Sequence, residues 1–456
     1  MKSLVMLFIV LSIALNFTAI GCGGKYEPGI QGTPTPSAGN TTLTPTPKGG
    51  VTTPKQSSPT PKPPLTPIQE STLPLNGILF HQFGSGQGAV AVGVAVDSES
   101  NIYVAGSVKG ALPNQISSGQ VDGFVRKYDA AGNELWTRQY SPGSISQNSF
   151  FAVDNLGNIY LLGGYLRKWD TNGVEFLHIE YGYDSRTDAS YNCIAADKQG
   201  CVYLVGRVFA PNPQNIPSRT YDAFLHKYSP TGERLWDKRW GYMRTNSTSS
   251  FDENDCVDEA YSVTLDANDN IYVSGSTEGD ETQPGNRPHH AFLNKYDANG
   301  ILEWSVEYGI SLNGSGEEAR VEATNVIADS QGNVYVAGGA FGNSGANRFL
   351  RKYDTNGNEL WTQQYNSYVT VYDLCLNPDK EGSLYMLAAS DMSNAIIKYN
   401  SQGSELWTSE VSKTTKFGQL FAEASDTSDN LYIVGGTYGP DFGWVSDAFI
   451  VKIKAD

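Results

Sequence analysis

One unit of sequence recurs seven times after residue 85, and this repeat leaves the chain few possible folds. The first half of the unit is an aspartate, a short turn and a strand-like run ending in a small residue, as in Asp97-Ser-Glu-Ser-Asn-Ile-Tyr103-Val-Ala-Gly106. The aspartate precedes the tyrosine by six residues in every unit, and the tyrosines are Tyr103, Tyr160, Tyr203, Tyr272, Tyr335, Tyr385 and Tyr432. Chance does not preserve such a spacing seven times, so the chain is a repeat array.

The second half of the unit is a strand, a tight glycine turn and another strand, as in residues 124–136. Apolar and polar residues alternate there with the period of a half-buried strand. Turns such as Asp129-Ala-Ala-Gly132-Asn suit hairpins, because glycine and asparagine tolerate positive φ. Each unit therefore predicts a four-stranded antiparallel sheet with strands a to d. The second unit is degenerate, with Trp169, Gly173 and Phe176 at the equivalent places.

A lone sheet of this kind cannot bury both of its faces, whereas sheets stacked radially around an axis bury them. The sequence therefore predicts an all-β fold, a seven-bladed β-propeller over residues 76–456. The seventh unit ends at residues 449–456 without a d strand, and residues 77–84 resemble an isolated d strand. We expect this N-terminal strand to complete the last blade and to close the ring.

The repeated pattern Gly-Asn-Ile-Tyr-Val-Ala-Gly, then Asp-Ala-Phe-Val-x-Lys-Tyr-Asp, then Gly-Asn-x-Leu-Trp, is similar to the bacterial SBBP family of β-propeller repeats. The resemblance covers residues 77–456 and recurs in every predicted blade. Members of that family are mostly exported bacterial proteins. The resemblance therefore implies a propeller and an extracytoplasmic location, and it implies no particular chemistry.

The N-terminus is typical of an export signal. Lys2 precedes an apolar stretch at residues 4–15 that is too short for a confident membrane span. The run Ala19-Ile-Gly-Cys22 resembles the lipobox of bacterial lipoproteins. We predict that residues 1–21 are a lipoprotein signal peptide and that Cys22 carries the lipid. The alternative is an ordinary signal peptide with Cys22 incidental.

Residues 22–75 differ sharply in composition from the rest of the chain. Twelve of the 22 prolines lie there, among Thr, Ser and Gly. Such a segment lacks the apolar side chains that offset the entropy cost of ordering, so we predict a disordered, extended tether. Together these features predict an exported protein, anchored by its lipid on the outer face of the cell envelope or in the periplasm.

Charge and loop lengths narrow the possible partners. The formal net charge of −16 argues against nucleic acid, which needs a basic surface. The a–b and c–d turns are short, whereas the longest b–c and d–a connections fall in the third and fourth units, at 207–220, 241–260, 276–290 and 309–323. We predict a site on this loop-rich face over blades 3 and 4. The alternative is that these are tolerated insertions. We expect a monomer.

One of these connections is rich in carboxylates. Asp252, Asp255, Asp258 and Glu259 lie in it and form a candidate Ca²⁺ site, although their order does not match the calcium loop of EF-hands. A solvated acidic rim is the alternative, and Glu317, Glu318 and Glu322 form a second acidic patch. We predict no other cofactor. An exported location permits disulfides, and Cys193 with Cys256 is the preferred pair.

Other candidate residues have structural explanations. We expect the turn aspartates to cap their own turns, the d-strand tryptophans to pack between blades, and His289 and His290 not to share a metal. No nucleophile accompanies a histidine and an acid in a recognisable motif. The sequence therefore predicts a non-catalytic module that binds a protein or glycan of the cell envelope. The alternatives are a glycan hydrolase or lyase, a quinone-dependent dehydrogenase, or an envelope scaffold.

Overall fold

The computed structural model describes residues 79–141, 150–154, 156–163, 165–180, 189–210, 220–241, 257–278, 289–310, 319–342, 345–366, 376–378, 384–389, 393–412, 418–426, 428, 430–438 and 445–454. The chain separates into two units, residues 1–69 and 70–456, and every described residue lies in the second. This described part contains strands and turns, and it has no helix long and apolar enough to cross a membrane.

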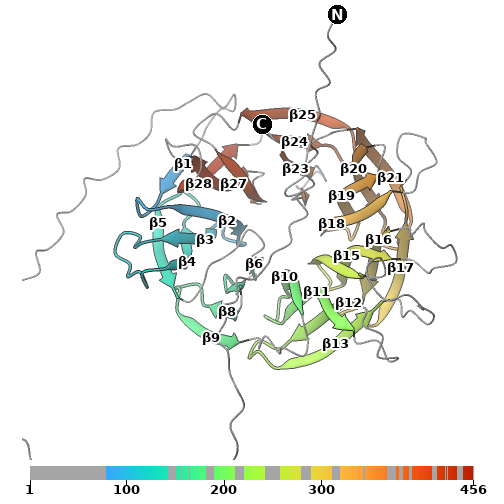
Figure 1. Cartoon of the computed structure of the whole chain (residues 1–456), viewed down its shortest axis with the longest axis horizontal. Helices are drawn as coiled ribbons and strands as arrows, with labels where there is room; N and C mark the ends of the chain where they lie inside the picture. Colours follow the sequence, from blue (N-terminus) through green and yellow to red (C-terminus); the bar gives the residue numbers. More distant parts are fainter. Residues whose placement is uncertain are drawn as a thin grey trace, which may run out of the picture. The chain divides into compact units, whose positions relative to one another are not determined.

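The strands form seven four-stranded antiparallel sheets arranged around a central axis (Figure 1). From the inner to the outer strand, blade 1 is β2 (Ala89–Val96), β3 (Ile102–Lys109), β4 (Val121–Tyr128) and β5 (Glu134–Tyr140), and blade 2 is β6 (Phe150–Val153), β7 (Ile159–Leu162), β8 (Tyr165–Trp169) and β9 (Glu175–Glu180). Blade 3 is β10 (Ser190–Ala196), β11 (Val202–Ala210), β12 (Thr220–Tyr228) and β13 (Arg234–Trp240), and blade 4 is β14 (Glu259–Leu265), β15 (Ile271–Glu278), β16 (His289–Tyr296) and β17 (Leu302–Tyr308). Blade 5 is β18 (Arg320–Ala328), β19 (Val334–Gly342), β20 (Gly345–Tyr353) and β21 (Glu359–Asn366), and blade 6 is β22 (Leu376–Pro378), β23 (Leu384–Ala389), β24 (Ser393–Tyr399) and β25 (Glu405–Ser412). Blade 7 is β26 (Gln419–Ser425), β27 (Asn430–Tyr438), β28 (Val445–Lys454) and β1 (Leu79–Phe83). The predicted seven-bladed propeller is confirmed.

The ring closes as the sequence predicts. Strand β1, the first in the chain, pairs antiparallel with β28, the last, from Leu79 opposite Lys452 to Phe83 opposite Ala448. The inner strands β2 and β26 contact each other, so blades 1 and 7 are neighbours (Figure 1). The last blade is therefore built from both ends of the propeller sequence.

The repeated aspartate holds the a–b hairpin of its own blade. In blade 1, Asp97 Oδ1 accepts hydrogen bonds from the backbone N–H groups of Glu99 at 2.9 Å and Asn101 at 2.8 Å. Its other oxygen accepts one from the buried Tyr103 hydroxyl at 2.9 Å. The same backbone and tyrosine bonds recur at Asp154, Asp197, Asp266, Asp329 and Asp426. The predicted capping role is confirmed at these six turns, and the bond to the tyrosine explains the fixed spacing of six residues.

In blades 1, 4 and 5 the d-strand tryptophan joins the blade to the next one. Trp136 Nε1 in blade 1 donates to the carbonyl of Thr171, in the c–d turn of blade 2, at 3.1 Å. Lys127 Nζ donates to the same carbonyl at 3.3 Å and lies 4.9 Å from the centre of the Tyr103 ring. Trp304 with Lys295, and Trp361 with Lys352, repeat this contact on the next blades. The prediction that these tryptophans pack between blades is confirmed.

Candidate binding pocket between blades 3 and 4

The two faces of the ring differ in how their strands are connected. The a–b hairpins and the c–d hairpins keep one length through the described blades, for example 97–101 and 129–133 in blade 1 and 266–270 and 297–301 in blade 4. The b–c and d–a connections on the opposite face vary, as predicted. We call this opposite face, which carries the b–c and d–a connections, the loop-bearing face.

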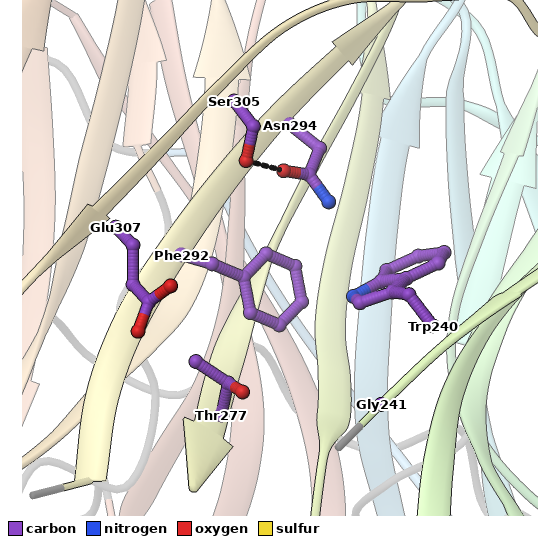
Figure 2. Close-up of a pocket in the computed structure, with 7 residues that line it drawn as sticks. All are labelled: Trp240, Gly241, Thr277, Phe292, Asn294, Ser305 and Glu307. Atoms are coloured by element: carbon purple, nitrogen blue, oxygen red, sulfur yellow. Dashed lines mark hydrogen bonds between the residues drawn. The ribbon is translucent and has the colours of Figure 1, made fainter. Parts of the chain in front are cut away.

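A pocket of about 220 Å³ lies between blades 3 and 4 (Figure 2). It is lined by Trp240, Gly241, Thr277, Phe292, Asn294, Ser305 and Glu307. Trp240 is the last residue of β13, and Thr277 is next to last in β15. Both strands end at the loop-bearing face, so the pocket lies at the end of the blades where the sequence predicts a site.

Comparison of the blades explains why a pocket exists at this place. In three blades an arginine immediately before the c-strand Lys-Tyr or Lys-Trp pair lies over an aromatic ring from the outer strand of the preceding blade. These pairs are Arg126 over Phe83 at 4.0 Å, Arg167 over Tyr140 at 4.6 Å and Arg351 over Tyr308 at 4.1 Å from the ring centre. In blade 4 the equivalent residue is Asn294, and the equivalent ring is Trp240, which pairs with Ala223 as Tyr308 pairs with Ala291. The shorter asparagine leaves the space beside the indole unfilled.

The partner of that arginine is also replaced in blade 4. The three arginines pair with the first glutamate of their own d strand: Arg126 with Glu134 at 3.3 Å, Arg167 with Glu175 at 2.8 Å and Arg351 with Glu359 at 3.3 Å. Glu134 is opposite Tyr128 in the strand register, whereas Leu302 is opposite Tyr296 in blade 4. Blade 4 therefore lacks both members of the ion pair.

The pocket has aromatic walls and polar edges. The Trp240 and Phe292 rings meet edge to face, 5.6 Å apart at 86°. Ser305 Oγ donates to Asn294 Oδ1 at 2.6 Å, the bond drawn in Figure 2. The indole nitrogen of Trp240 is buried, and no group in the described residues accepts its hydrogen bond. A buried donor without a hydrogen-bond partner costs free energy. Such donors occur at sites where a bound ligand supplies the missing acceptor.

Carboxylates dominate the rim of the pocket. Glu307 is opposite Phe292, where blades 1 and 5 have Gln139 and Gln364 opposite their phenylalanines. Glu307 Oε1 lies 3.0 Å from His290 Nδ1.

Two further carboxylates flank Gly241. A Cβ on this glycine would lie 2.6 Å from Asp222 Oδ1 and 2.8 Å from Asp258 Oδ2. Burial raises the pKa of Asp222, and Arg239, 3.4 Å away, opposes that effect. Glu307 and Asp222 are thus partly exposed carboxylates at or beside the pocket, each next to one basic group. The buried Asp258 adds a third carboxylate near Gly241, so acidic side chains outnumber basic ones here, which favours a cationic ligand.

The predicted calcium ligands do not all fall in the described residues. Asp258 is buried and accepts hydrogen bonds from Thr277 Oγ1 and, at 3.2 Å, from the Glu278 N–H. Glu259 accepts from Asn192 Nδ2 at 2.7 Å, and burial raises its pKa. These two side chains therefore have different protein partners on blades 4 and 3. Asp252 and Asp255 lie outside the described residues, so the Ca²⁺ site stays a prediction.

The other candidates are placed as follows. Cys193 is on β10 with its sulfur 3.8 Å from the Val263 carbonyl oxygen, and Cys256 lies outside the described residues, so their disulfide stays a prediction. Glu322 pairs with Arg320 at 2.8 Å, while Glu317 and Glu318 are not described. Within the described ranges, no three His, Cys, Asp or Glu side chains form a group that could hold a metal.

Comparisons with known proteins bear on the fold. No family model matches the chain. An uncharacterized WD repeat-containing protein of Acanthamoeba polyphaga mimivirus is 30% identical over 99 residues, and the match spans 19% of this chain and 7% of that protein's length.

Several solved structures match most of the chain at low identity and with TM-scores below 0.5. YCF48 bound to D1 peptide is 10% identical with a TM-score of 0.43 and covers 84% of this chain and 99% of its own. The polysaccharide lyase Uly1 is 10% identical with a TM-score of 0.47, covering 81% and 90%. Drosophila Plexin A in complex with Semaphorin 1b is 10% identical with a TM-score of 0.41, covering 83% and 87%. At such identities the similarity concerns the fold and carries no role to this chain.

Proposed function

We propose that this chain is a binding module of the cell envelope, an exported lipoprotein whose propeller docks a protein partner at the loop-bearing face of blades 3 and 4. The pocket beside Trp240 is the observation that carries the proposal. It lies beside residues 241–258, the longest connection between two described strands, and it joins an aromatic wall to an acidic rim. Desolvated aromatic residues next to polar groups are typical of the centre of protein interfaces.

The composition of the pocket supports binding over glycoside hydrolysis. Canonical glycosidases place two carboxyl groups on either side of the scissile bond. Glu307 is the sole carboxylate among the residues that line this pocket. The remaining polar groups are hydroxyls and an amide, which bind and orient ligands.

A glycan is the second candidate partner, because Trp240 offers an aromatic face next to Asn294 and Ser305. Sugars stack on such faces while amides and hydroxyls bond their ring hydroxyls.

Capture of partners by the full-length protein tests the proposal. The pocket is filled in the variant Asn294→Arg with Leu302→Glu, which rebuilds the ion pair of blades 1, 2 and 5. Ile116→Arg is the matched control, since Ile116 is 90% exposed on the b–c connection of blade 1, at the same face. We expect cross-linking in envelope extracts to recover a protein with the wild type and the control but not with the filled variant.

Two results would contradict the proposal. Equal capture by all three proteins would place the interface elsewhere. Turnover of an envelope glycan by the purified chain, abolished in the filled variant, would make the pocket an active site.

A further inference from the structure

We propose that the pocket between blades 3 and 4 binds the guanidinium group of an arginine on the partner protein. This inference rests on the proposed function and names the chemistry that the module would recognise. The observation that carries it is a comparison between blades. In three other blades, the space equivalent to this pocket is filled by an arginine of the chain itself, and we call this space the slot.

The filled slots indicate the group that complements the empty one. Arg126, Arg167 and Arg351 each lie 4.0–4.6 Å from the centre of the aromatic ring of the preceding blade. The equivalent aromatic ring is also present beside blade 4. It is Trp240, and tryptophan is the aromatic side chain that attracts cations most strongly. Among the described residues, the place of the arginine is taken by Asn294, whose side chain is shorter and uncharged. The planar guanidinium stacks on such a ring better than the ammonium of lysine.

The acidic group of the slot has moved in the same blade. In the filled slots the carboxylate is the first glutamate of the d strand, partly exposed at the c–d hairpin end of the blade. Blade 4 has Leu302 there, and the next residue, Glu303, pairs with Lys295 at 2.9 Å. The carboxylate on the pocket lining is Glu307, near the loop-bearing face. A side chain that enters the pocket has both Glu307 and Trp240 in its lining. A carboxylate can accept two parallel hydrogen bonds from a guanidinium.

The charges around the pocket favour the same ligand. Asp222 and the buried Asp258 lie beside Gly241, which lines the pocket, and the whole chain carries a formal charge of −16. The basic groups that face these carboxylates are His290 at Glu307 and Arg239 at Asp222. A neutral sugar would gain nothing from this excess of negative charge, whereas a cation is attracted by it.

Calorimetric titration of the full-length protein with small probes tests the inference. N-acetyl-arginine amide represents an arginine within a polypeptide, and N-acetyl-citrulline amide is its neutral counterpart of nearly the same shape. We expect the arginine probe to bind and the citrulline probe to bind at least about tenfold more weakly, with an affinity that falls as salt is added. Equal binding of the two probes would overturn the inference. Tighter binding of free arginine than of the capped form would point to a free amino acid and would overturn it as well.

Variants place the binding in this pocket. Asn294→Arg with Leu302→Glu is expected to abolish binding of the arginine probe while the thermal midpoint stays equal or rises, because the chain then fills its own slot. Glu307→Gln, which restores the residue of blades 1 and 5, should weaken binding about tenfold. Unchanged binding in the filled variant would refute the proposed site.

Two arginines of the chain itself, Arg244 and Arg287, lie outside the described residues on the connections next to the pocket. If their replacement by alanine raises the affinity for the probe more than about tenfold, the chain supplies its own arginine and the inference about a partner is wrong. The binding-module proposal is judged separately: a protein captured by the wild type and lost in the filled variant supports that proposal even if neither small probe binds.

Discussion

A single glycine in the repeat sets how closely the strands of a blade pack. Gly275 is opposite Phe292 in the register of β15 and β16, and a Cβ on it would lie 2.1 Å from the Glu259 carbonyl oxygen and 2.5 Å from the Phe292 ring. Four other blades pair glycine with phenylalanine in the same way, and blade 6 instead pairs Ala388 with Ala395. Glycine therefore stands opposite phenylalanine in these blades, and its lack of a side chain leaves room for the ring.

We expect Gly275→Ala to lower the free energy of unfolding by about 1–3 kcal/mol, because overpacking forces the backbone apart. Urea denaturation measures this change. Gly309→Ala is the control, since a Cβ there meets only the His290 ring at an ordinary 3.4 Å. Equal losses in the two variants would show that backbone freedom, and not packing, explains the repeated glycine.

Buried His226 makes the stability of the ring depend on pH. Its ring stacks on Phe224 at 4.2 Å, its side chain has no hydrogen-bond partner at Nδ1 within the described residues, and burial, with Arg234 adding to it, lowers its pKa to about 4. The unfolded state, with a pKa near 6.5, binds the proton more readily. The stability from the neutral ring is therefore complete above about pH 6.5 and is lost as the pH falls towards 4, by about 3 kcal/mol in all.

The test is the slope of unfolding free energy against pH from 7 to 4. We expect His226→Ile, which places the residue type of Ile397 in blade 6 at this position, to flatten the slope. His178→Gln, at an exposed histidine, should leave it unchanged. An identical slope in His226→Ile would assign the acid sensitivity to carboxylates.

The pocket residues could not be predicted from the sequence, although other residues of the repeat could. The turn aspartates and the tryptophans are predictable, because each recurs at the equivalent position in several of the seven units. The position of Arg126 varies around the ring: it is His226 in blade 3, Asn294 in blade 4 and Ile397 in blade 6, so Asn294 resembles ordinary degeneracy. The loss of the ion pair is visible only once Arg126 and Glu134 are known to touch, and the pocket itself only once Trp240 is placed beside Asn294.

Among the elements, strand β1 contributes most to the closure of the ring. It pairs with β28, and its Phe83 is buried, meeting the Phe124 ring edge to face at 5.5 Å. The Arg126 guanidinium also lies over the Phe83 ring, 4.0 Å from its centre. Without β1, the outer edge of blade 7 is unpaired and these contacts are exposed.

We expect deletion of residues 76–84 to cost at least about 3 kcal/mol, the loss that follows truncation of one buried phenylalanine, and to promote aggregation through the free edge. Thermal unfolding and light scattering check this outcome. Deletion of residues 23–69, which precede the strand, is the control and should leave the melting temperature as it is. A stable, monomeric ring without residues 76–84 would mean that β1 is dispensable.

Element boundaries were predictable where turn chemistry fixes them. The a–b and c–d hairpins begin at an Asp or its equivalent and end at the next strand, so their lengths follow from the sequence. The b–c connections lack such a marker: the expected connection at 207–220 is shorter because β11 continues to Ala210. The long connection at 110–120 in blade 1 was not singled out, and Gln139 holds it there through Leu112 N–H at 2.9 Å and Asp122 at 2.7 Å.

At the scale of the whole molecule, the order of the segments links the anchor to the ring. The predicted lipid at Cys22 and the proline-rich tether lead directly into β1, the strand that closes the propeller. We expect the wild type to fractionate with membranes and to incorporate labelled fatty acid. Cys22→Ser should lose both properties, while its melting temperature is unchanged because β1 and the blades are intact.

The same variant separates anchoring from recognition. If the tether serves to present the loop-bearing face, purified Cys22→Ser protein should bind its partner as the wild type does, and only capture on intact cells should fail. A wild type that is soluble and unlabelled would contradict the anchor. A purified variant that no longer binds would instead mean that the lipid-bearing segment belongs to the interface, and the pocket beside Trp240 would then be too small a part of the surface to explain recognition.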